Sequence, residues 1–159
     1  MSHTDYKLLE SQLISLIGDE DDALANAANF VALLYNAMID VNWLGIYVLR
    51  GEELVLGPFQ GQTACVRIPL GKGVCGTAAA KLETQRVADV HDFPGHIACD
   101  VASRSEIVVP LLVDDQLIGV LDLDSPSPDR FSASDQDGIE SLCSAYCETI
   151  KKGGRIQFL

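Results

Sequence analysis

The sequence lacks an apolar run long enough to cross a membrane, and it lacks the leader of a secreted protein. No stretch of 18 apolar residues occurs, and the opening residues MSHTDYKLLESQL place no basic segment before an apolar one. We therefore expect a cytoplasmic protein. Thiols are kept reduced in that compartment, so the five cysteines are expected to include catalytic or metal-binding groups rather than a static disulfide framework.

Positive charge is also scarce. The chain has 11 Lys and Arg against 23 Asp and Glu, a net charge of −12, and its basic residues are scattered. Proteins that bind nucleic acid or a membrane surface present a basic patch, so we expect neither partner. Internal repeats and long Pro- or Ser-rich linkers are lacking too. One domain over residues 1–159 is expected, and the 48% apolar content suffices for its core.

The spacing of apolar residues predicts an α+β fold. Helical periodicity predicts two helices within about residues 4–38 and a closing helix at about 132–151. Between them, β-rich runs predict a mostly antiparallel sheet over about 42–124. Its expected elements are the hairpins 42–49 with 53–56 and 105–113 with 116–122, the strands 63–68 and 85–87, and a short helix at 74–81.

The cysteines fall into two groups. Cys65, Cys75 and Cys99 lie in loop-like sequence rich in Gly, His and Pro, where a thiol is available for chemistry. Cys143 and Cys147 are four residues apart in the amphipathic closing helix and are expected to face the core. Only the first three are predicted to be redox thiols.

Two other motifs are weaker. His91, His96 and Cys99, with a further cysteine, have the chemistry of zinc ligands, but no C-x2-C pair occurs and the histidines do not share a helical face, so we expect no metal. The glycine-rich segment GKGVCG (71–76) lacks the ending of a Walker loop and the G-x-G-x-x-G spacing. A tight strand-to-helix turn is favoured there over a phosphate site.

Two sets of side chains are candidates for a pocket. Period-two geometry places Trp43, Gly45 and Tyr47 on one strand face, as a small pocket wall or as ordinary core aromatics. The same geometry places Asp122 and Asp124 about 7 Å apart on one face.

Glu106 can join these two carboxylates across the second hairpin. Such a cluster suits an ammonium group, a metal ion or a carboxylic acid kept protonated. Solvated acids at strand ends are the alternative, and periodicity does not decide between them.

Several segments together resemble the free methionine-(R)-sulfoxide reductase family: NWLGIYVL, LVLGPFQG, ACVRIPLGKGVCGTA, HIACD, RSEIVVPL and IGVLDLDS. The resemblance spans about residues 42–125 and includes the spacing of Cys65, Cys75 and Cys99. It implies a GAF-type fold, in which an antiparallel sheet is backed by N- and C-terminal helices. It also implies reduction of free L-methionine-(R)-sulfoxide with no bound cofactor.

The resemblance assigns roles to the three cysteines. Cys99 would attack the sulfoxide sulfur, release methionine and become a sulfenic acid. Cys65 would resolve it as a disulfide, and Cys75 would be an auxiliary thiol able to exchange with that disulfide. Thioredoxin, or another dithiol, would restore the reduced enzyme, and a homodimer is implied.

The family also assigns the substrate pocket. Trp43 would pack on the terminal methyl group and Tyr47 would line the same pocket. Glu106, Asp122 and Asp124 would bind the ammonium group and protonate the sulfoxide oxygen, with Glu106 and Asp124 favoured near the sulfoxide. The backbone N–H groups of Ile97, Ala98 and Cys99 are our candidates for the substrate carboxylate.

Two rival functions stay open. A GAF fold can serve as a non-catalytic sensor module that binds a small molecule, although such a module needs no three thiols at this spacing. A thiol peroxidase or peroxide sensor would use the cysteines but would leave the acid cluster unexplained.

Overall fold

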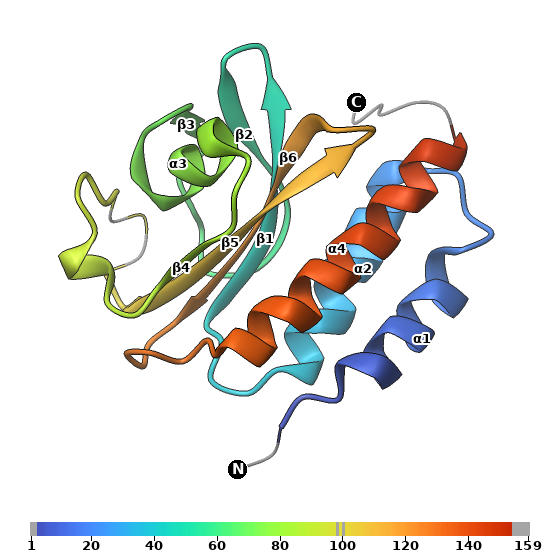
Figure 1. Ribbon diagram of the computed structural model, residues 1–159, viewed down its shortest axis with the longest axis horizontal. Helices are drawn as coiled ribbons and strands as arrows, with labels where there is room; N and C mark the ends of the chain where they lie inside the picture. The colour runs from blue at the N-terminus through green and yellow to red at the C-terminus, as the bar shows by residue number, and fades with distance from the viewer. Residues whose placement is uncertain (1–2, 98, 100, 154–159) are drawn as a thin grey trace.

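The computed structural model describes residues 3–97, 99 and 101–153. Figure 1 shows the arrangement of its elements. The helices are α1 (Tyr6–Ile17), α2 (Ala23–Ala37), α3 (Gly73–Lys81), a 3-10 turn η1 (Val90–Asp92) and α4 (Ala133–Gly153). The strands are β1 (Trp43–Arg50), β2 (Glu53–Gly61), β3 (Arg67–Pro69), β4 (Gln85–Val87), β5 (Ser105–Val113) and β6 (Gln116–Ser125).

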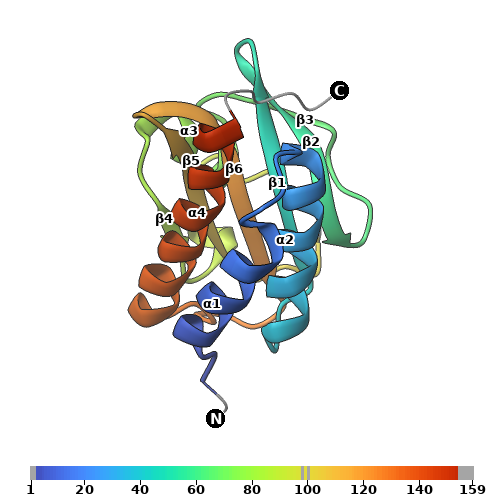
Figure 2. The same cartoon turned by 90° about the vertical axis from the view of Figure 1, so that its right-hand side faces the viewer.

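The strands form one sheet in the order β3-β2-β1-β6-β5-β4, and every neighbouring pair is antiparallel. Helices α1, α2 and α4 cover one face of this sheet, whereas α3 lies against the other (Figures 1 and 2). The predicted fold class, an antiparallel sheet backed by the terminal helices, is confirmed. Among the described residues, no helix is long and apolar enough to span a membrane.

The two faces of the sheet have separate cores. The larger one lies under α1, α2 and α4, where residues at helical spacing such as Leu9, Leu13 and Ile17 are buried against the sheet. Cys143 and Cys147 of α4 belong to it, so the prediction that they face the core is confirmed. The smaller core lies between α3 and the opposite sheet face and includes Trp43. The candidate site is therefore built on the thinner side of the molecule.

The predicted third strand is present, but its bounds of 63–68 are wrong, because β3 contains only Arg67–Pro69. The segment before it is irregular, and side chains of β1 bind its backbone carbonyls. The Trp43 indole donates to the carbonyl of Gln62 at 3.0 Å, and the Tyr47 hydroxyl donates to that of Cys65 at 2.8 Å. These bonds satisfy backbone groups that a strand would have paired.

Two strands are longer than their patterns predict. β2 continues to Gly61 and β6 continues to Ser125. The extension of β6 brings Asp124 into the sheet, where it is the register partner of Trp43 on β1 and of Glu106 on β5. The sheet thus sets these three side chains side by side.

Candidate active site

A pocket lies on the α3 side of the sheet and encloses about 40 Å³. Strands β1, β5 and β6 form its floor, and α3 and the segment before β5 form its walls. Eight of the predicted site residues line it: Trp43, Tyr47, Cys75, Ile97, Cys99, Glu106, Asp122 and Asp124. Ala98 lies outside the described residues.

The aromatic residues make one wall. The rings of Trp43 and Tyr47 stack with centroids 5.9 Å apart, and Phe59 of β2 stacks on the other side of Trp43 at 5.4 Å. Gly45 leaves room for this arrangement, since a Cβ atom there would lie 2.5 Å from the Trp43 ring. Trp43 and Tyr47 are both buried and both line the pocket. They are therefore core aromatics and pocket wall at the same time.

The acids form a buried cluster. Glu106 and Asp122 are each only 6% exposed, so the interpretation as solvated acids is wrong for these two. Single ligand atoms of Cys75, Glu106 and Asp122 all lie within 4.8 Å of one another, which is also the spacing a metal ion could use. Asp124, less buried, lines the same pocket.

Burial determines the protonation of this cluster. It raises the pKa of Glu106 well above its usual range, and the negative charges of Asp122 and Asp124 raise it further. Burial raises the pKa of Asp122 to about 6, against hydrogen bonds to Glu106 and Cys75 that lower it. Glu106 is therefore the acid that keeps a proton at neutral pH, and Asp122 is the one that ionises. A buried carboxylic acid of this kind can donate a proton to a ligand.

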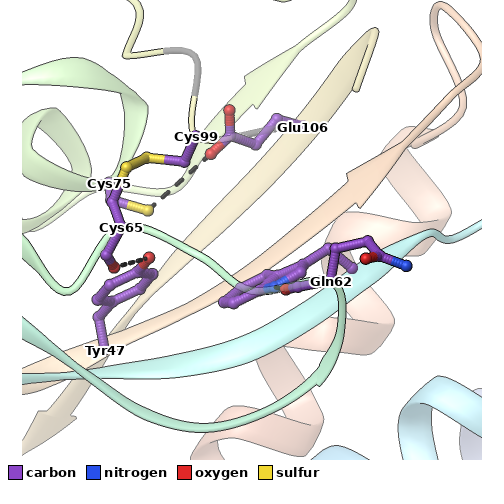
Figure 3. Close-up of a disulfide and its surroundings, with 7 residues drawn as sticks. Tyr47, Gln62, Cys65, Cys75, Cys99 and Glu106 are labelled. Carbon is purple, nitrogen blue, oxygen red and sulfur yellow. Dashed lines mark hydrogen bonds between the residues drawn. A yellow bond between two sulfur atoms is a disulfide. The ribbon is translucent and has the colours of Figure 1, made fainter. Parts of the chain in front are cut away.

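Cys75 does not lie in a loop. It occupies the first turn of α3, is 4% exposed, and its Sγ lies 3.9 Å from Glu106 Oε1 (Figure 3). Burial, followed by the charges of Asp122 and Glu106, raises the pKa of this thiol well above its usual range. Its context is therefore not loop-like, because the glycine-rich turn leads directly into the helix expected at 74–81. Its role as an auxiliary thiol stays a prediction.

Cys65 and Cys99 form a disulfide that joins the segment before β3 to the segment before β5 (Figure 3). The Cys99 N–H donates to the Ile97 carbonyl at 3.0 Å. Ile97 lies beside the start of α3, where a Cβ atom built on Gly73 would lie 3.2 Å from Ile97 Cγ1. Of the two bonded cysteines, Cys99 lines the acidic pocket, and Cys65 lies outside its lining.

The structure adds four polar residues that the sequence patterns did not single out as pocket residues: Thr63, Lys72, His96 and Ser103. Ser103 is 4% exposed, whereas Thr63 and Lys72 are exposed and His96 is half-buried. Burial, followed by the charge of His91, lowers the pKa of His96. Lys72 belongs to the glycine-rich segment 71–76, whose pattern predicts a tight turn and no ligand site. Ser103 is an isolated serine in a loop, and no sequence pattern distinguishes it.

The fold and this pocket define the class of the protein: a model of the GAF domain matches residues 19–150. A structure described as a putative GAF sensor protein from Burkholderia vietnamiensis is 56% identical, with a TM-score of 0.91 over 95% of this chain and 96% of that one.

More specific relatives narrow the class. The free methionine-R-sulfoxide reductase of Escherichia coli is 54% identical over 86% of this chain and 83% of its own length. The structure of fRMsr of Staphylococcus aureus in complex with substrate is 50% identical, with a TM-score of 0.90 over 94% and 98% of the two chains. The chain belongs to the free methionine-(R)-sulfoxide reductase family, a family of oxidoreductases, and the predicted resemblance is confirmed.

Proposed function

We propose that this chain reduces free L-methionine-(R)-sulfoxide to L-methionine with Cys99 as nucleophile. The observation that carries the proposal is the Cys65–Cys99 disulfide beside a buried pocket that combines an aromatic wall with a protonated acid. A binding module needs neither the disulfide nor the proton. A peroxidase would need the thiols but not the aromatic wall.

The first step breaks the sulfur–oxygen bond. The Cys99 thiolate attacks the sulfoxide sulfur while Glu106 protonates the oxygen. The oxygen is transferred to Cys99, which becomes a sulfenic acid, and methionine leaves as the thioether. Sulfur of the substrate is reduced by two electrons and sulfur of Cys99 is oxidised by two. Burial keeps Glu106 protonated, and the negative charges of Asp122 and Asp124 raise its pKa further.

The second step forms the disulfide. The Cys65 thiol attacks the sulfenic acid, the sulfur–sulfur bond forms, and the oxygen leaves as water. A dithiol donor of the cytoplasm, for which thioredoxin is our candidate, then reduces the disulfide and becomes oxidised itself. A homodimer and the absence of a bound cofactor or metal are parts of the same proposal.

The charge of the pocket accounts for a preference for the free amino acid. The ammonium group of free methionine sulfoxide is attracted by Asp122 and Asp124, and the Trp43 ring covers the terminal methyl group. In a peptide the same nitrogen is an uncharged amide that continues into chain. A peptide-bound residue would therefore lose the charge interaction and would also meet the closed walls of the pocket.

The test is turnover of the R and S epimers of free L-methionine sulfoxide, with thioredoxin, thioredoxin reductase and NADPH. We expect the R epimer alone to be consumed and Cys99→Ser to abolish this. Cys147→Ala, which removes a core thiol away from the pocket, is the control and should retain activity. A folded, reduced wild-type protein that consumes neither epimer would disprove the reductase.

A further inference from the structure

The hydroxyl of Ser103 is a buried polar group without a partner in the wall of the pocket. The residue is 4% exposed, and its Oγ has no hydrogen-bond partner. The same is true of Asp122 Oδ1. Burying a polar group without a partner is unfavourable, and groups of this kind in native proteins call for an explanation. Both atoms belong to residues that line the same pocket, so a ligand there can satisfy both.

The other buried donors of the pocket are already engaged. The Trp43 indole donates to the Gln62 carbonyl, and the Tyr47 hydroxyl donates to the Cys65 carbonyl. The Cys75 thiol contacts Glu106. Among the described residues that line the pocket, Ser103 is the remaining buried side chain whose hydroxyl is free to donate a hydrogen bond.

The substrate of the proposed function, on which this inference rests, presents two groups that accept hydrogen bonds. One is the sulfoxide oxygen, which takes the proton of Glu106. The other is the α-carboxylate, whose candidate backbone donors include the N–H of Cys99, and that N–H is occupied by the Ile97 carbonyl in the disulfide form. An ionised Asp122 carboxylate accepts hydrogen bonds and donates none, so its Oδ1 suits the ammonium group.

We propose that the Ser103 hydroxyl donates a hydrogen bond to the α-carboxylate of the substrate and thereby selects a free carboxyl group. Ser103 lies four residues after Cys99 and directly before the strand that carries Glu106. One short segment would thus supply the nucleophile, the carboxylate donor and the acid. The serine contributes to substrate binding, whereas Cys99 and Glu106 act on the sulfoxide group.

The test compares two substrates, L-methionine-(R)-sulfoxide and the (R) form of 3-(methylsulfinyl)propan-1-amine, which lacks the carboxylate. For Ser103→Ala we expect kcat/KM for the first to fall about 10- to 100-fold, mainly through KM, as for a lost bond to a charged group. For the amine the change should be under about 3-fold. Ser11→Ala, which removes an exposed hydroxyl of α1, is the matched control and should change neither value.

A structural role for Ser103 gives different results. Removing an unpartnered buried hydroxyl should leave the Tm of the free protein unchanged or higher, whereas loss of a structural bond would lower it. Equal losses on both substrates would assign the hydroxyl to the sulfoxide and would overturn the proposal. No loss on either would overturn it as well.

Binding separates this inference from the reductase itself. L-methionine and 3-(methylthio)propan-1-amine are titrated against reduced protein, with the fluorescence of Trp43 as the signal. A loss of affinity on Ser103→Ala for methionine alone supports the carboxylate contact even in a protein that turns nothing over. Unchanged affinity for methionine, in an active enzyme, rejects the contact and keeps the reductase.

Discussion

Cys75 and Glu106 form a buried acidic pair, with Sγ 3.9 Å from Oε1 and exposures of 4% and 6%. Burial raises the pKa of both groups. The charge of Glu106 raises the pKa of Cys75 further, whereas the hydrogen bond with Cys75 lowers that of Glu106. The thiol is therefore kept protonated where a nucleophile would need the thiolate. The pair supports a division of labour in which Cys75 contacts the acid while Cys65 and Cys99 exchange electrons.

Glu106→Gln tests the general acid. Glutamine keeps the shape and a hydrogen-bond donor but has no proton to transfer, so we expect kcat to fall by about 10²- to 10⁴-fold. Sulfenic acid formation at Cys99 with hydrogen peroxide, followed by a dimedone probe and mass spectrometry, should be retained. Glu148→Gln, on the exposed side of α4, is the control. Full turnover by Glu106→Gln would remove this residue from the reaction.

The raised pKa values predict an unusual dependence of stability on pH. A carboxyl whose pKa rises on folding binds more protons in the native state, so its contribution is present at low pH and is lost as pH rises. For Asp122 the free energy of unfolding falls by on the order of 3 kcal/mol as the pH rises from 3.8 to about 6. For Glu106 the decrease continues to higher pH.

Denaturant unfolding from pH 3 to 9 measures this effect. Other groups titrate as well, and the pKa of Asp135 lies below its usual range, so the wild type is compared with the double variant Glu106→Gln, Asp122→Asn. We expect the wild type to lose stability relative to the double variant above about pH 4. Parallel profiles would show that these two carboxyl groups titrate in the native state as they do in the unfolded chain.

Gly45→Ala should disturb the aromatic wall. A Cβ atom would lie 2.5 Å from both the Trp43 ring and Phe59 Cβ, so the indole has to move. We expect KM for the sulfoxide to rise about 10-fold or more and the fluorescence of Trp43, the single tryptophan of the chain, to change. Trp43→Phe, which keeps a ring without this clash, should be milder. An unchanged KM and spectrum in Gly45→Ala would show that the ring does not depend on this gap.

The three thiols of the reduced pocket should differ in reactivity. Cys75 is 4% exposed and its thiol is kept protonated, so we expect iodoacetamide at pH 8 to modify Cys65 and Cys99 at least 10-fold faster. Peptide mass spectrometry over a time course measures this, and Cys143, buried in the other core, is the internal standard for a slow thiol. Equal rates at Cys75 and Cys99 would make Cys75 an exchanging thiol after all.

The sequence predicts the elements of this fold well, because its apolar periodicity is regular on both sides of the sheet. The same alternation places Asp122 and Asp124 on one face, and the hairpin register adds Glu106. It does not reveal that Glu106 and Asp122 are buried, since a strand end at the surface and one under α3 have the same pattern. Burial decides their protonation, so the preference for Glu106 over Asp122 as the protonated carboxyl group rests on the structure.

Other differences have local causes. The segment before β3 carries residues of strand type, yet its backbone is bound by Trp43 and Tyr47 side chains, which no local pattern encodes. Cys75 follows a glycine-rich turn and lies in the helix expected at 74–81, but its burial depends on the packing of that helix on the sheet. Ser103 becomes a candidate for substrate binding only because its buried hydroxyl has no hydrogen-bond partner, which no sequence pattern predicts.

The disulfide also has a consequence for chain entropy. It closes a loop of 34 residues that contains β3, α3, β4 and η1, and a closure of this length stabilises a protein by about 4 kcal/mol. The terminal helices and their core lie outside the loop. Because the bond acts by restricting the unfolded chain, each reduction of the disulfide would lower the free energy of unfolding, and the reduced form would be the more easily unfolded of the two.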